Sequence, residues 1–136
     1  MIDEALQDHC LSDATLRRIV GDRIYPDFAP ASAAVPYVLR SRLSNPPHDH
    51  LAGEAAIASP TFQFTVVAAS NKQRNEVADA LRASLSRYSG PMGTDDVEVS
   101  SPEEADDIES AADGSERRLF VRRLDFEVWH SKEPAR

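Results

Sequence analysis

The sequence has few of the features that mark secreted, membrane or zinc-ribbon proteins. Among its 136 residues there is one cysteine, Cys10, which cannot form an internal disulfide or a multi-cysteine metal site. Its apolar runs are all shorter than the roughly 18 residues of a membrane-spanning helix, and its first ten residues are acidic where a signal peptide is basic and then apolar. We therefore expect no disulfide scaffold, no membrane association, and assembly in a cytosol.

Basic residues are missing from one long segment. Between Asp95 and Glu116 there are ten acids and no lysine or arginine, whereas the remainder of the chain has 13 acids and 15 bases. The net charge of −8 therefore comes from this segment, for which a solvated loop is the expected structure. Proteins that wrap nucleic acid need clustered lysine and arginine, so the composition argues against that class.

Catalytic motifs are also missing, including the glycine-rich phosphate loop and the nucleophile elbow. The triplet His48, Asp49 and His50 is the local cluster that could suggest a metal or a general base, but a zinc site needs three or four ligands and a supporting shell. Cys10 and its neighbour His9 are expected to be packed core residues. The sequence thus predicts no catalytic residue, no metal site, no cofactor and no enzymatic activity, with a small hydrolase as an alternative.

Hydrophobic periodicity predicts the secondary structure. Helical spacing indicates two short helices in the first 20 residues and a longer one over about 71–88, which opens with the capping-box pair Ser70 and Gln73. Alternation of apolar and polar residues indicates strands, at 36–44, 61–69, 97–99 and 118–130.

These elements fit one domain over residues 1–136. The predicted class is α+β, with a mainly antiparallel four-stranded sheet on which one long helix and a short N-terminal helix pair are packed. Flexible loops are expected at about 45–60, which is rich in proline, and at about 102–116, within the acidic segment.

Charged residues on the predicted strands are candidates for a subunit interface. Arg40 and Arg42 share the polar face of the strand at 36–44 and are expected to point outward, while Arg122 falls on the apolar face of the last strand. An unpaired charge there is costly, so either the strand bends or bulges or Arg122 meets a carboxylate. A surface ion pair and a subunit interface, where arginine is enriched, are both open for this residue. The candidate interface residues are Arg40, Arg42, Arg122, Arg123, Asp125 and Glu127.

Several segments together resemble a known family. Residues 20–26 read VGDRIYP, residues 35–38 read VPYV, residues 62–64 read FQF, residues 76–82 read EVADALR and residues 123–129 read RLDFEVW. This string is similar to the tail-completion proteins of long-tailed bacteriophages and prophages, also called tail terminators or tail-to-head joining proteins. The resemblance covers most of the chain, and the acid-rich stretch at 101–116 departs from the shorter turn more usual in the family.

The resemblance implies an α+β fold, no enzymatic activity, and a hexameric ring of identical subunits that caps the tail tube and ends its growth. The implied partners are further copies of the chain, the major tail tube protein and the head–tail connector or stopper. DNA would pass through the lumen without specific binding. The implied location is the neck of a virion assembled in the host cytoplasm, and another neck component, such as a stopper or adaptor ring, is the related alternative.

Overall fold

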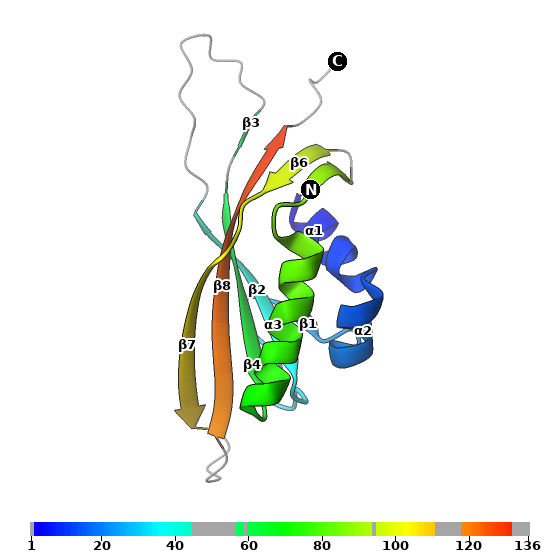
Figure 1. The fold of residues 1–136 in the computed structure, drawn as a ribbon. Helices are drawn as coiled ribbons and strands as arrows, with labels where there is room; N and C mark the ends of the chain where they lie inside the picture. The colour runs from blue at the N-terminus through cyan, green and yellow to red at the C-terminus, as the bar shows by residue number, and fades with distance from the viewer. Residues whose placement is uncertain (1, 45–56, 59, 94, 111–117, 132–136) are drawn as a thin grey trace.

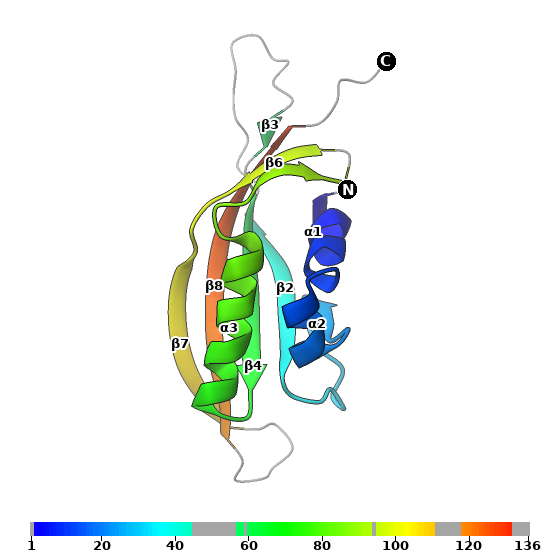
Figure 2. The same cartoon turned by 45° about the vertical axis from the view of Figure 1, so that its right-hand side comes forward.

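A computed structural model of the chain describes residues 2–44, 57–58, 60–93, 95–110 and 118–131. Within these residues, eight strands form one curled mixed sheet, and three helices lie against one of its faces (Figures 1 and 2). We call the side of the sheet that carries the helices the helix face and the opposite side the open face. In this part of the chain, no helix is long and apolar enough to cross a membrane.

The helices are α1 (Ile2–Leu11), α2 (Ala14–Val20) and α3 (Asn71–Leu85). The Asp13 carboxylate accepts the N–H groups of the first turn of α2, and Gly21, at φ 61°, ends that helix. At α3 the Ser70 hydroxyl accepts the Gln73 N–H at 3.1 Å, while the Gln73 side chain accepts the Ala69 N–H at 2.8 Å. Ser70 and Gln73 therefore cap the helix as expected from the sequence, except that the Gln73 side chain binds the N–H one residue before the N-cap.

The strands are β1 (Ile24–Pro26), β2 (Tyr37–Ser44), β3 (Ile57–Ala58), β4 (Thr61–Ala68), β5 (Ser89–Met92), β6 (Asp95–Val99), β7 (Glu103–Ser110) and β8 (Arg118–Ser131). Their order across the sheet is β1-β2-β4-β8-β6-β5. β1 runs parallel to β2, and the other pairs are antiparallel. β8 is the central strand, because β4 and then β3 pair along one of its edges while β7 and then β6 pair along the other.

The hydrophobic core lies between the helices and the helix face of the sheet. Phe64 and Phe126, on neighbouring strands, meet edge to face with ring centroids 5.7 Å apart. Phe62, Phe64 and Val66 of β4 and Leu124, Phe126 and Val128 of β8 enter this core at every second position, as the alternating pattern predicts. The helices contribute Leu6, Leu16, Val20, Val77, Leu81 and Leu85, all fully buried.

The predicted four-stranded, mainly antiparallel sheet with one long helix is wrong. The sheet has twice that number of strands and is mixed, and α3, the longest helix, has 15 residues. The prediction missed β1, β3, β5 and β7, because none of them alternates apolar with polar residues over a length typical of a strand. Each is held by backbone hydrogen bonds to a neighbouring strand, and those bonds do not depend on an alternating side-chain pattern.

The predicted acidic loop at 102–116 is also wrong over most of its length. Glu103–Ser110 is the strand β7, which pairs with β8 over eight residues. Residues 111–116 lie outside the described residues. The predicted loop at 45–60 falls largely outside them as well, and its described part includes the two-residue strand β3.

Candidate subunit interface

Arg40 does not point outward as predicted, while Arg42 lies on the same face of the sheet and is exposed. In register with Phe64 and Phe62 of β4, they lie on the helix face of the sheet, and Arg40 is only 8% exposed. The mistake came from the alternation of Tyr37, Leu39 and Leu43. Tyr37 and Leu39 in fact lie on the open face, and Leu43 falls at a register shift between Arg42 and Ser44, where it is 53% exposed. β2 has apolar residues on both faces, since Val38 is fully buried beside Arg40, so the pattern did not distinguish the two faces.

Both arginines bind the first turn of α1. Arg40 donates to the Gln7 side chain at 3.1 Å and lies 3.6 Å from the Asp3 carboxylate, while Arg42 also binds Asp3. The Arg42 guanidinium stacks 5.4 Å from the ring centroid of Phe62. These contacts join α1 to β2 within one chain.

Arg122 meets a carboxylate, which was one of the two alternatives left open by the sequence. Its guanidinium donates to both oxygens of Asp106 on β7, at 2.6 and 3.0 Å, and to the Asn75 side chain at 3.0 Å. The hydrogen bond from Arg122 holds the pKa of Asp106 below its usual value, and the same bond raises the pKa of Arg122. Arg74 and Arg82 of α3 extend the network, 3.6 Å from Asp106 and 3.5 Å from Glu104 respectively.

Arg123, Asp125 and Glu127 lie on the open face, along β8. Arg123 binds Glu109 at 3.2 Å, Asp125 accepts from the Gln63 side chain at 3.0 Å, and Glu127 accepts the Trp129 indole N–H at 2.7 Å. The six candidates therefore divide between the two faces of the sheet. Their role in a subunit interface stays a prediction.

On the open face, a few buried apolar side chains are surrounded by acidic side chains. Val67 and Val121 are adjacent on neighbouring strands and almost fully buried. Tyr37 lies on the same face, where burial and then the charge of Glu109 raise its pKa. The strand register places seven carboxylates on this face, those of Asp96, Glu98, Glu103, Asp107, Glu109, Asp125 and Glu127, and one guanidinium, that of Arg123.

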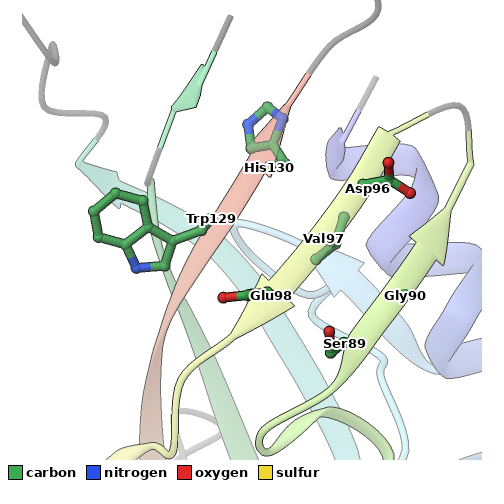
Figure 3. A pocket seen from close by; sticks show the side chains of 7 residues that line it. All are labelled: Ser89, Gly90, Asp96, Val97, Glu98, Trp129 and His130. Carbon is green, nitrogen blue, oxygen red and sulfur yellow. The ribbon is translucent and has the colours of Figure 1, made fainter.

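A hollow of about 430 Å³ lies where β5, β6 and the end of β8 meet. Figure 3 shows the Trp129 indole projecting from β8 on the side away from α1, with Glu98 between it and β5. The hollow is lined by Ser89, Gly90, Asp96, Val97, Glu98, Trp129 and His130. Our sequence analysis missed this place, although the chain's single tryptophan at a polar-face position of the last strand was a usable signal.

The residues weighed for catalysis are not arranged as a catalytic pair. Cys10 is fully buried, and burial raises its pKa to about 12. The His9 ring packs edge to face on Tyr88, and its Nε2 is hydrogen-bonded to the Ser84 carbonyl at 3.0 Å. Within the described ranges, no three His, Cys, Asp or Glu residues are grouped so as to hold a metal, while His48, Asp49 and His50 lie outside those ranges.

Comparison with known proteins identifies the family. Residues 4–131 match the model of a family described as tail completion protein gp17. The chain belongs to this family. The resemblance read from the sequence is therefore confirmed, and the protein has a structural role in a virion tail.

The fold is similar to that of a chain in the solved structure entitled virion of native gene transfer agent (GTA) particle. The two chains share 17% sequence identity with a TM-score of 0.59, and the match covers 96% of this chain and 98% of the other. At this identity the likeness shows a shared fold. No curated protein matches the sequence.

Proposed function

We propose that this tail completion protein forms a ring that caps the tail tube, stops its growth and joins the tail to the head connector. A ring of identical subunits needs two unlike surfaces, so that one surface binds the other on the next copy. The observation that supports the proposal is the difference between the two sides of the sheet, one covered by helices and the other open and acidic.

The charge of the open face favours this type of ring over a symmetric dimer. Two acidic faces of the same kind repel each other, and like charges placed together across an interface cost several kcal/mol. The partners above and below the ring would be the tail tube protein and the connector or stopper. A subunit with a net charge of −8 is also suited to line a channel through which DNA passes, because its excess of acids does not attract the phosphates.

The proposal is tested by deleting the gene from cells that make the particles and examining the products by electron microscopy. We expect filled heads without tails, together with free tails of abnormal length, and a plasmid-borne copy of the gene should restore normal particles. Free tails of normal length would instead favour a stopper or adaptor ring. Normal particles from the deletion strain would exclude a role in tail completion.

A further inference from the structure

The hollow beside Trp129 has the chemistry of a site for a cationic side chain. Trp129 is 39% exposed and forms one wall, and its indole N–H is bound to Glu127, which fixes the orientation of the ring. The carboxyl groups of Asp96 and Glu98 line the same hollow. A guanidinium attracted by an indole ring and by carboxylates gains both a cation–π contact and charge-assisted hydrogen bonds.

Ser89 and Gly90 of β5 form the wall of the hollow across from Trp129. Ser89 pairs with Glu98 and therefore lies on the same face of the sheet, whereas Gly90 pairs with Val97. This wall of the hollow is therefore built from small residues.

A complementary group lies on the other side of the same chain. Arg17 and Arg18 are exposed in the last turn of α2, which belongs to the helix layer (Figure 2). In the part of the chain that the structure describes, neither of them forms an ion pair. They are adjacent in the sequence, so the end of α2 presents two guanidinium groups on the layer opposite to the hollow.

We propose that the hollow receives the Arg17–Arg18 end of α2 from the next subunit of the ring. The inference rests on the proposed ring and specifies which two surfaces meet in it. Hollow and helix end lie on opposite sides of one subunit, as a head-to-tail contact requires. Tryptophan and arginine are also the residue types that dominate the binding energy of interfaces.

Charge reversal with rescue tests the contact in assembled particles. One variant carries Asp96→Lys and Glu98→Lys, a second carries Arg17→Glu and Arg18→Glu, and a third carries all four changes. Each is expressed in the deletion strain, and intact particles are counted by electron microscopy. We expect each two-residue variant to lower the yield at least about tenfold, since like charges then face each other, and the four-residue variant to recover most of it.

Controls separate a folding defect from an assembly defect. All four positions are exposed, so the purified variants should melt within a few degrees of the parent. Lys72→Glu, at another exposed base, should leave the yield unchanged. Normal particle yield from both two-residue variants, or no recovery when the changes are combined, would overturn the proposed contact but not the proposed ring. Normal particles from the deletion strain would instead overturn the proposed ring.

Discussion

β4 and β7 are two strands with the same partner and opposite surroundings. Each has eight residues and pairs antiparallel with β8, β4 over residues 120–127 and β7 over residues 118–125. The side chains of β4 are alternately buried, whereas those of β7 are exposed over residues 103–109. The two strands therefore pair with β8 over the same number of residues, but β4 buries many of its side chains and β7 leaves its side chains exposed.

Different forces hold the two strands in place. On β4, Phe62, Phe64 and Val66 are fully buried, and each such side chain stabilises the fold by about 1.5–3 kcal/mol. On β7, neighbouring carboxylates repel one another, and the arginines of β8 and α3 offset that repulsion. The position of β7 thus depends on side chains that other elements supply.

The largest effect should come from truncating the core on the β4 side. Phe64→Ala removes a fully buried ring that packs against Phe126, and we expect a loss of about 3–5 kcal/mol in the free energy of unfolding, measured with urea. Ile108→Ala on β7 is the matched control, because that side chain is 53% exposed, and its cost should stay below about 0.5 kcal/mol. Equal losses from the two variants would contradict the distinction between the strands.

A smaller, pH-dependent effect should come from Asp106 on β7. Its pKa is lowered by the hydrogen bond from Arg122, so the folded protein favours the charged carboxylate more than the unfolded chain does. The resulting stability is complete above the usual pKa of 3.8 and is lost as the pH falls through the lower folded value. Asp106→Asn should therefore have a lower melting temperature than the parent at pH 6, and this difference in melting temperature should become smaller in acid.

Thermal melts of both proteins at several pH values check this prediction. Asp8→Asn is a suitable control, because Asp8 is an exposed carboxylate on α1, away from β7. If the difference in melting temperature between the Asp106 variant and its parent stayed constant into strong acid, the ion pair with Arg122 would not stabilise β7.

The smallest effect is expected at Cys10, which probes the core shared by the helices and β4. Its thiol is fully buried and burial raises its pKa to about 12, so little of the reactive thiolate is present at pH 8. A disulfide reagent should not label the folded protein measurably, and it should label the chain fully in urea. Rapid labelling without urea would mean that the helix layer opens readily above the sheet.

The candidate interface shows where reasoning from sequence was limited. A carboxylate partner for Arg122 was one of the alternatives that the sequence left open, and Asp106 is such a partner. The sequence did not indicate the face on which Arg40 and Arg42 lie. An arginine can lay its stem over a ring such as Phe62 and bind a carboxylate such as Asp3 with its head, so a charged residue on one side of a strand does not identify the solvent side.

The sequence by itself determined the family, the start of α3, and the apolar strands β4 and β8. The family came from the resemblance of several segments to tail-completion proteins. The helix start and the two strands follow from local signals, namely a capping pair, a helical spacing and a period of two, which need no knowledge of distant residues. Only the tertiary structure decided that part of the acidic segment is the strand β7, that the sheet is mixed, and that Trp129 lines a hollow. The reason is physical: β7 is held by a backbone partner and by arginines from other elements, and contacts between distant segments leave no periodic trace in the strand itself.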